Sequence, residues 1–387
     1  LYGWAMSQPL PTGNFRWLGE REIREFTPEF IQSIADDSST GYVAEVDLVY
    51  PEELHELHNA FPLTPDRLVI TKDMLSPYAL SFDRDFLPAE KLVPNLQDKQ
   101  NYTTHYRNLK LYLELGLRMT KVHRVLAFDQ SAFMKAYIDK NTDKRKQAKD
   151  DFEKDFFKLL NNSVFGKTME NVREHIDLKL VTNHHRLKKL AAKPNCKFFE
   201  RINDELALVN MGKQNVLLNK PIYVGFSILE VSKTLMYDFH YNKVMRRDEA
   251  ERATLLFTDT DSLCYKIQTE NLYEDMYQDR HFYDTSNYPA QHKLFSTVNG
   301  KVLGKFKDET ASVPPVEFVG LKAKMYSLLV SHSEPAKLTA KGVKRSWGDK
   351  NLTHKISNVY LKTGMRPTLN FTNLRLSDTL SIPASSI

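Results

Sequence analysis

The sequence is poor in cysteine and has no long apolar run. Only two of its 387 residues are cysteines, Cys196 and Cys264. They are too few for a disulfide framework or a four-thiolate zinc site, so a reducing, intracellular compartment is the simpler interpretation. No stretch approaches the ~18 consecutive apolar residues of a membrane-spanning helix. The opening Leu1-Tyr2-Gly3-Trp4 lacks the regions of a signal peptide, which leaves nucleus and cytoplasm open.

A strong net charge is also absent, but the charge is unevenly distributed. The formal net charge is +5, while the part from Gln291 to the end has 15 Lys and Arg against 6 Asp and Glu, a balance of +9. The first 290 residues therefore carry −4. A basic C-terminal part suits a polyanionic partner such as nucleic acid, although a solvated basic surface is an equal alternative on charge alone.

Aromatic residues are abundant, and they exclude disorder as a global description. The chain contains 22 Phe, 18 Tyr and 3 Trp, enough to bury a large apolar surface. Its length predicts two or three packed units. Helical and strand patterns follow one another without a regular βαβ rhythm, which predicts an α+β fold.

Periodicity and turn residues locate the expected elements. Helices are expected at 108–117 and 228–245, and strands at 41–48, 122–128, 178–181, 254–257, 263–267, 316–319 and 325–330. A hairpin over 205–218 is expected to turn at Met211-Gly212. Segment 131–162 contains neither Gly nor Pro and is expected to form two helices joined at 139–143, a helical hairpin.

Two aspartates beside an expected strand form the pattern with the most specific chemistry. Asp259-Thr260-Asp261-Ser262 follows the strand expected at 254–257. Carboxylates this close repel one another, and a divalent cation commonly compensates them. Mg²⁺ held by carboxylates and substrate phosphates is typical of nucleotidyl transfer with two metal ions. The alternatives are an Asx-rich structural turn and the Asp-x-Asp of a sugar-nucleotide glycosyltransferase.

A second pattern lies at the end of the expected helical hairpin. The run from Lys158 to Gly166 combines a lysine that can neutralise a triphosphate, the flat ring of Phe165 and a glycine that admits close approach. Phe152 and Phe156 fall on a different side of the same helix from Lys158. The ordinary alternative is a helix that ends in a C-cap at Gly166, with a solvated row of lysines.

Two basic patterns follow in the C-terminal part. In Lys322-Ala323-Lys324-Met325-Tyr326, a lysine and a tyrosine face the same side of an expected strand, which suits contact with a nucleic-acid duplex. Lys341-Gly342-Val343-Lys344-Arg345 gathers three cations around one glycine and suits a phosphate contact. An ordinary solvent-exposed face is the alternative for the first of these two patterns.

This ordered set resembles the polymerase core of family B DNA polymerases, specifically the protein-primed branch of viruses, linear plasmids and Polinton/Maverick transposons. Lys158-x-x-x-Asn162-Ser163-x-Phe165-Gly166 is similar to motif B (K-x₃-N-S-x-Y-G), with phenylalanine in place of tyrosine. Asp259-Thr260-Asp261-Ser262 looks like motif C, and Lys324-Met325-Tyr326 like the K-x-Y motif. The resemblance extends over essentially the whole chain. The glycosyltransferase alternative, in contrast, does not explain the patterns at Lys158–Gly166 and Lys324–Tyr326.

Motif A of the family, Asp-x-x-x-Leu-Tyr-Pro, has two candidate positions. Leu1-Tyr2-Gly3 is similar to its end, with glycine in place of proline, and we favour this placement. The motif's aspartate would then precede Leu1, so we expect an N-terminally truncated chain without the exonuclease domain. Asp47-Leu48-Val49-Tyr50-Pro51 competes, but its Asp and Tyr are separated by three positions instead of five, so we expect Asp47 to be structural.

The resemblance implies a role for each matching residue. Asp261 and Asp259 would be the catalytic residues and the ligands of two Mg²⁺ ions, with Mn²⁺ as a substitute. Tyr2 would exclude a 2′-hydroxyl. The residues that bind the nucleotide would be Tyr2, Lys146, Lys158, Asn162 and Phe165. The residues that bind DNA would be Ser163, Gly166, Thr258, Lys324, Tyr326, Lys341 and Lys344.

The implied architecture is a right hand. Its palm would comprise 1–70 and 173–330, its fingers 129–172 and its thumb 331–387, with insertions at 71–128 and 185–220 that resemble terminal-protein regions 1 and 2. The implied reaction is template-directed addition of dNMP to a primer 3′-hydroxyl. Its partners would be primer–template DNA and dNTPs, with a terminal protein as a further candidate primer. The alternative is a catalytically inactive, nucleic-acid-binding relic of a mobile element.

Overall fold

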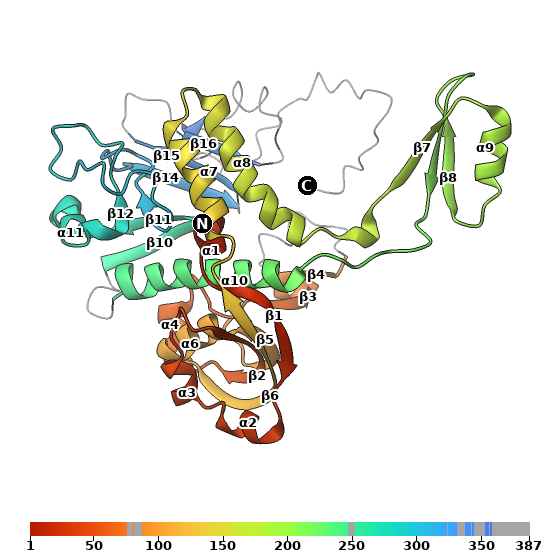
Figure 1. The fold of residues 1–387 in the computed structure, drawn as a ribbon. Helices are drawn as coiled ribbons and strands as arrows, with labels where there is room; N and C mark the ends of the chain where they lie inside the picture. The colour runs from red at the N-terminus through yellow and green to blue at the C-terminus, as the bar shows by residue number, and fades with distance from the viewer. Residues whose placement is uncertain are drawn as a thin grey trace. The chain divides into compact units, whose positions relative to one another are not determined.

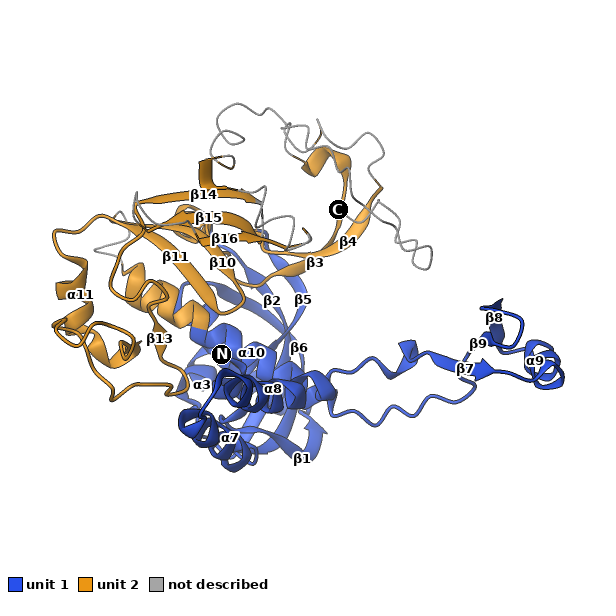
Figure 2. Ribbon diagram, turned by 90° about the horizontal axis from the view of Figure 1, so that it is seen from above, with its two compact units in different colours: residues 1–51, 97–235 blue, residues 52–96, 236–387 orange. Residues whose placement is uncertain are grey.

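The computed structural model describes residues 1–75, 80, 87–246, 252–322, 324–330, 337–341, 343, 353–355 and 357. The chain divides into two compact units: unit 1 comprises Leu1–Pro51 and Gln97–Leu235, and unit 2 comprises Glu52–Leu96 and Met236–Ile387 (Figure 2). Both units contain helices together with strands, which confirms a mixed helix-and-sheet protein. The expected palm, fingers and thumb boundaries remain predictions.

A four-stranded antiparallel sheet is the centre of unit 1 (Figure 1). Its order is β1-β6-β2-β5, with bounds β1 Leu10–Trp17, β2 Thr40–Val49, β5 Lys99–His105 and β6 Arg118–Ser131. The strands expected at 41–48 and 122–128 are therefore confirmed and extended. A Cβ on Gly41 would overlap the ring of Phe128, its partner on β6, so a larger residue here would force that buried ring to move.

Helices accompany this sheet along the chain. Their bounds are α1 Tyr2–Met6, α2 Glu20–Glu25, α3 Pro28–Ser33, α6 Tyr106–Glu114, α7 Lys135–Gln147, α8 Asp151–Thr168, η3 Val172–Glu174 and α10 Ile222–Asp238, which continues past the end of unit 1. The largest fully buried side chains of unit 1 include Tyr106, Tyr112 and Phe128. Burying such rings stabilises the unit mainly through the hydrophobic effect.

The expected helical hairpin is present, but its break is not where the sequence indicated. Helix α7 runs straight through 139–143, and the break lies between α7 and α8 at 148–150. The polar residues Asn141 and Thr142 are buried rather than looped out. Asn141 Nδ2 donates to Asn161 Oδ1 at 2.9 Å, which links the two helices. Asp150 is the N-cap of α8, and its carboxylate accepts a hydrogen bond from the Glu153 N–H at 2.7 Å.

A separate three-stranded sheet follows α8 in unit 1. Its order is β7-β9-β8, with β7 Asp177–Val181, β8 Cys196–Arg201 and β9 Ala207–Met211, and helix α9 His184–Ala191 packs on it. The strand expected at 178–181 is confirmed. The hairpin expected over 205–218 is wrong, because β9 ends at Met211 and pairs with β7 and β8 instead. Apolar residues on both sides of Gly212 imitate a hairpin there, whereas β9 forms its hairpin with the preceding strand β8, across the short loop 202–206.

Unit 2 is built from short helices and small sheets, which are antiparallel apart from one parallel pair of two-residue strands. Its helical elements are η1 Glu52–Leu54, α4 His55–His58, η2 Lys72–Met74, η4 Phe239–Val244, α11 Leu272–Gln278 and η6 Arg280–Phe282. Its strands are β3 Asp66–Ile70, β4 Ala89–Val93, β10 Ala253–Asp259, β11 Ser262–Ile267, β12 Tyr283–Asp284, β13 Phe306–Lys307, β14 Glu317–Lys322, β15 Met325–Leu329 and β16 Lys337–Ala340. The strands expected at 254–257, 263–267, 316–319 and 325–330 are thus confirmed.

Three further expectations concern the helix at 228–245, membrane association and the thumb. The helix expected at 228–245 is confirmed as α10 followed by the π-helix η4. None of the helices in the described ranges combines the length and apolarity needed to cross a bilayer. Most of the expected thumb, 331–387, lies outside the described residues.

Two buried histidines of unit 2 make its stability depend on pH. Burial lowers the pKa of both His58 and His240 to about 4, from an ordinary value near 6.5. The unfolded chain therefore binds more protons than the folded one between these values. Stability is complete above pH 6.5 and falls as the pH decreases toward 4, by on the order of 2 kcal/mol for each histidine at pH 5.

Urea unfolding at pH 7.5, 6.0 and 5.0 measures this dependence. The midpoint should fall steeply between pH 6.0 and 5.0, and His240→Gln should flatten the slope. His281→Gln, at an exposed position, is the control and should leave the slope unchanged. A midpoint that is constant over this range would contradict the assignment of both histidines.

Candidate functional site

The expected aspartate pair lies on a tight turn between two antiparallel strands. Strands β10 and β11 pair up to Asp259 and Ser262, so that Thr260 and Asp261 alone form the turn. The Asp261 N–H donates to the Asp259 carbonyl at 2.6 Å. Thr260 has φ 58°, a left-handed conformation that a β-branched residue rarely adopts. Such strained turns recur at functional sites.

Asp259 forms an ion pair and a hydrogen bond at this turn. Lys324 Nζ lies 2.9 Å from Asp259 Oδ1. The hydrogen bond from Lys324 holds the pKa of Asp259 below its usual range, and the same contact raises the pKa of Lys324. The Thr260 hydroxyl donates to the same oxygen at 3.2 Å. The structure therefore brings together two predicted site residues, Asp259 and Lys324, that the sequence could not pair.

The other predicted residues of unit 2 lie around the same hairpin. The Tyr326 ring stacks on Phe257 of β10, with centroids 4.2 Å apart and planes at 24°. The Lys341 N–H donates to the Lys324 carbonyl at 3.0 Å, which fixes the chain of Lys341 beside Lys324. Thr258 is exposed. Lys344 lies outside the described residues.

The donor chemistry of the turn fits part of a magnesium site. Within the described part of the chain, no group of three or more His, Cys, Asp or Glu side chains could hold a metal ion by itself. Asp259 and Asp261 could therefore supply only part of a coordination sphere. Mg²⁺ is commonly bound by one or two carboxylates, with waters and substrate phosphates completing the octahedron, so this donor set fits it.

In unit 1, the predicted residues Tyr2 and Phe165 lie against each other. Their rings stack with centroids 4.5 Å apart and planes at 17°. Tyr2 begins α1, and Phe165 lies in the last turns of α8. Both residues are only partly buried.

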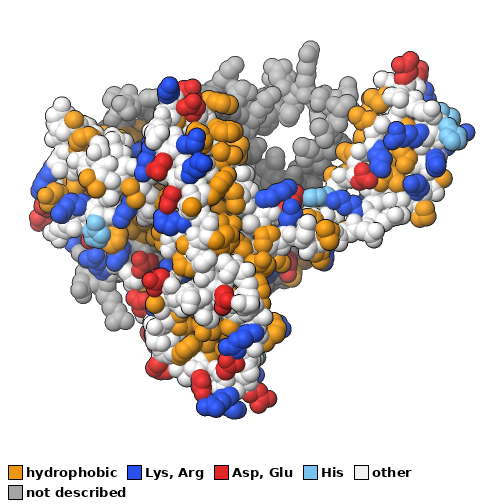
Figure 3. Space-filling view, viewed as in Figure 1, with side chains coloured by type: hydrophobic (Ala, Val, Ile, Leu, Met, Phe, Trp, Pro, Cys, Tyr) orange, Lys and Arg blue, Asp and Glu red, His pale blue; other side chains and the backbone are white. Residues whose placement is uncertain are grey.

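Helix α8 presents its predicted residues to solvent. Lys158 and Asn162 are exposed and line a shallow hollow on the helix together with Phe152, Phe156 and Leu159. Figure 3 shows hydrophobic side chains gathered along this helix. The phenylalanines were expected on a different side of the helix from the lysine row, whereas Phe152 is 79% exposed and shares this hollow with Lys158.

Three further predicted residues lie on the hairpin of helices α7 and α8. Lys146, on α7, is 3.7 Å from Asp143 in an exposed ion pair. The Ser163 hydroxyl donates to the Leu160 carbonyl at 3.0 Å. Gly166 lies inside α8, which continues to Thr168, so the C-cap alternative is wrong.

A Cβ on Gly166 would meet no atom of the described chain within 4 Å. Glycine inside a helix costs about 1 kcal/mol relative to alanine. Packing among the described residues therefore does not require glycine at this position.

Asp47, the competing motif A residue, is held by structure. Its Oδ1 accepts from the Asn101 N–H at 2.8 Å and contacts His123 Nε2 at 2.7 Å. The hydrogen bond from Asn101, followed by that from His123, lowers the pKa of Asp47. Its carboxylate therefore ties β2 to β5 and β6, in agreement with the structural role expected for it.

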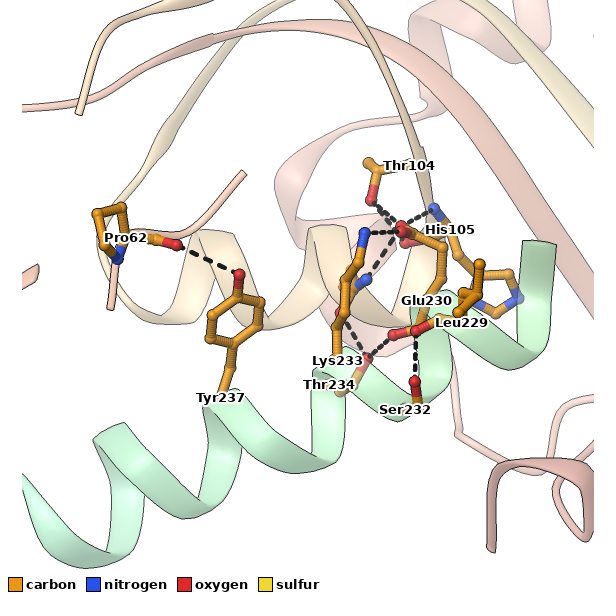
Figure 4. A network of polar contacts seen from close by, with 10 residues as sticks. Pro62, Thr104, His105, Leu229, Glu230, Ser232, Lys233, Thr234 and Tyr237 are labelled. Carbon is orange, nitrogen blue, oxygen red and sulfur yellow. Dashed lines mark hydrogen bonds and ion pairs between the residues drawn. The ribbon is translucent and has the colours of Figure 1, made fainter. Parts of the chain in front are cut away.

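Sequence analysis missed a buried carboxylate on α10. Glu230 is 4% exposed, and its Oε2 accepts from the Thr104 hydroxyl at 2.9 Å, the His105 N–H at 3.2 Å and Asn108 Nδ2 at 3.0 Å (Figure 4). Its Oε1 accepts from Lys233 Nζ at 2.8 Å. A glutamate within the apolar run 228–231 was the signal that could have revealed it.

A basic cavity in unit 1 also escaped prediction. It has a volume of about 650 Å³ and lies between the end of α8 and the β7-β9-β8 sheet. Glu170 is one of its lining residues and forms ion pairs with Lys220 at 2.7 Å and Lys167 at 2.8 Å. The hydrogen bonds from these two lysines lower the pKa of Glu170 to about 2. Further lysines on its wall are Lys179, Lys193 and Lys213.

Comparison with known proteins places the fold but not a family. No family model matches the chain, and no curated protein matches it. Several solved structures are similar to it, and two of them have TM-scores above 0.5. An orthorhombic crystal form of Phi29 DNA polymerase has a TM-score of 0.51 and 13% identity, covering 89% of this chain and 50% of that chain. Phi29 DNA polymerase complexed with primer–template DNA and incoming nucleotide substrates also has a TM-score of 0.51, with 15% identity, covering 92% of this chain and 51% of that chain.

This likeness shows a DNA-polymerase-like fold over about nine-tenths of the chain. The chain spans about half the length of the solved structures that it matches. The fold was predicted in outline by the ordered motifs, and the similarity supports that outline independently of them.

Proposed function

We propose that this chain is the polymerase core of a DNA-directed DNA polymerase of the protein-primed family B type, arranged as palm, fingers and thumb. The observation that carries the proposal is the Asp259–Asp261 turn with Lys324 beside it, in a chain whose fold is similar to that of a DNA polymerase. The reaction would be addition of dNMP to a primer 3′-hydroxyl, with release of pyrophosphate. We place the chain in a mobile or viral element because of its motif resemblance.

Each unit would contribute its own residues to this reaction. In unit 2, Asp259 and Asp261 would hold two Mg²⁺ ions, which supply activation of the primer hydroxyl and neutralisation of charge on the phosphates. Tyr326, stacked on Phe257, would hold the primer–template together with Lys324. In unit 1, Lys158 would bind the triphosphate, with Lys146 as a second candidate.

The remaining predicted residues would read the substrate and the DNA. Tyr2 would lie under the deoxyribose, while Asn162 and Phe165 would meet the nascent base pair. Ser163, Gly166 and Thr258 would contact DNA, as would Lys341 and Lys344 through backbone phosphates. Primer–template DNA and dNTPs would be the partners, with a terminal protein as a candidate primer.

Primer extension and duplex binding, measured side by side, test the proposal. The assay uses a chain that carries the motif A aspartate expected upstream of Leu1, with labelled primer–template, dNTPs and Mg²⁺. Extension that requires template, Mg²⁺ and all four dNTPs is expected. Salt-dependent duplex binding without any extension would instead support the inactive, nucleic-acid-binding relic.

Removal of the Tyr2 ring should weaken sugar discrimination. With Tyr2→Ala, we expect the preference for dNTP over rNTP to fall by about 10- to 100-fold, since a side chain that fills space against the 2′ position is worth ~1–3 kcal/mol. Single-nucleotide insertion kinetics measure the ratio. Tyr2→Phe keeps the ring and is the control. Unchanged rNTP exclusion in the alanine variant would argue against placing motif A at Leu1-Tyr2-Gly3.

Removal of the Lys158 charge should raise KM for dNTP. A charge-assisted contact to phosphate is worth about 1.5–3 kcal/mol, so Lys158→Ala should raise KM by roughly 10- to 100-fold. Lys154→Ala is a matched control one turn earlier on α8, where the lysine contacts Asp151 at 2.8 Å. Equal effects of the two variants would show a general charge effect of the helix and contradict a specific role for Lys158.

A further inference from the structure

The ion pair between Lys324 and Asp259 occupies the carboxylate that the proposed function assigns to a metal ion. Lys324 Nζ lies 2.9 Å from Asp259 Oδ1, and the two side chains are 42% and 32% exposed. The ammonium is therefore within direct contact of the oxygen on which a cation would bind. Two cations cannot share one carboxylate oxygen at contact distance without strong repulsion.

Backbone geometry aims the lysine at the aspartate. Lys324 has φ 60°, an unusual left-handed conformation for a lysine, immediately before β15. The β14–β15 pairing shifts in register between Gly320 and Lys322, just before this residue. The stack of Tyr326 on Phe257 holds β15 against β10, the strand that ends at Asp259. An uncommon conformation, retained where the surrounding packing determines it, is a reason to look for function.

We propose that Lys324 is an internal counter-ion for Asp259 that a divalent cation must displace, so that metal binding and the release of Lys324 to a nucleic-acid phosphate favour one another. This inference rests on the proposed function, because that function supplies the metal and the DNA. Without metal, Lys324 neutralises Asp259. With metal, the ammonium leaves the carboxylate and is available to a phosphate oxygen. By linkage, DNA that draws Lys324 away tightens metal binding, and metal tightens DNA binding by the same factor.

Direct measurement of Mn²⁺ binding tests this coupling without any catalytic readout. Mn²⁺ is titrated into the full chain, without nucleotide, and free Mn²⁺ is followed by electron paramagnetic resonance. Lys324→Met keeps the length of the side chain and removes its charge, so Mn²⁺ should bind about tenfold more tightly, as expected for the loss of one competing charge-assisted contact. Lys324→Gln should act in the same direction.

Two comparisons identify the site and the source of the effect. Lys266→Met removes a lysine of the same β10–β11 hairpin and should change Mn²⁺ affinity much less than Lys324→Met. Asp259→Asn should weaken Mn²⁺ binding and abolish the effect of the Lys324 variants. A short primer–template duplex should tighten Mn²⁺ binding to the unsubstituted chain by a larger factor than to Lys324→Met.

The outcomes separate this inference from the proposed function. If Lys324→Met and Lys266→Met bind Mn²⁺ equally, while Asp259→Asn binds it more weakly, the counter-ion role is overturned and the metal site stands. If duplex DNA tightens Mn²⁺ binding equally in the unsubstituted chain and in Lys324→Met, the coupling is overturned. If no form binds Mn²⁺, with or without duplex, both the metal site and the counter-ion role are overturned.

Discussion

Replacement of Asp261 by asparagine should reduce primer extension by about 10³-fold or more, since loss of a metal ligand removes several kcal/mol of charge stabilisation and each 1.36 kcal/mol is tenfold in rate. The asparagine has the same shape but no charge. Asp261 lies in the two-residue turn after Asp259, where its side chain is exposed. The substitution should therefore leave the β10–β11 hairpin folded.

Steady-state extension and duplex binding, measured on the same preparation, distinguish catalysis from binding. Measured without divalent cation, Asp261→Asn should bind primer–template with the affinity of the unsubstituted chain and with the same salt dependence, because the phosphate contacts come from lysines. Glu270→Gln, an exposed residue shortly after β11, is the control for loss of one negative charge. Retained extension in Asp261→Asn would remove this residue from the metal site.

Replacement of Glu230 by leucine should destabilise the protein by about 3–5 kcal/mol, the range found when one partner of a buried charged network is removed. The reason is the number of donors that lose their acceptor. Thr104, the His105 N–H and Asn108 all donate to one carboxylate oxygen, and Lys233 donates to the other. Leucine would leave these groups buried without their acceptor, and each such loss is costly.

The titration of Glu230 adds a pH signature to this prediction. Burial raises the pKa of Glu230, but Lys233 and the hydrogen bonds from Asn108 and His105 outweigh burial, so the pKa lies below its ordinary value of 4.5. A carboxylate with a lowered folded pKa stabilises the protein above pH 4.5, and this contribution is lost as the pH falls through the folded value.

Urea unfolding at pH 7 measures the stability of each variant. Glu230→Gln keeps the size and one acceptor oxygen, so it should lose less stability than Glu230→Leu. Glu114→Gln, on the exposed side of α6, is the control and should have almost no effect. A Glu230→Leu variant as stable as the control would show that the network contributes nothing to folding.

Local pattern was sufficient for most strands and for the turn that carries Asp259 and Asp261. Alternation of apolar residues predicted the strand at 41–48, and β2 indeed buries Ala44, Val46 and Leu48. The aspartates of the turn are neighbours in sequence, so their proximity needed no tertiary information. The pattern failed at 139–143, where polar residues suggested a loop. There Asn141 bonds across to Asn161, and the Thr142 hydroxyl donates to the Ile138 carbonyl at 2.7 Å, so neither polar side chain needs water.

The sequence by itself determined the mixed fold, the helical hairpin and the order of the motifs, because periodicity and spacing act through the local backbone. Only the tertiary structure decided which distant residues meet. It placed Lys324 on Asp259, stacked Tyr2 on Phe165 and brought the donors of Thr104, His105 and Asn108 to Glu230. These contacts join segments far apart in the chain, and their formation depends on how whole elements pack and on which buried polar groups need partners.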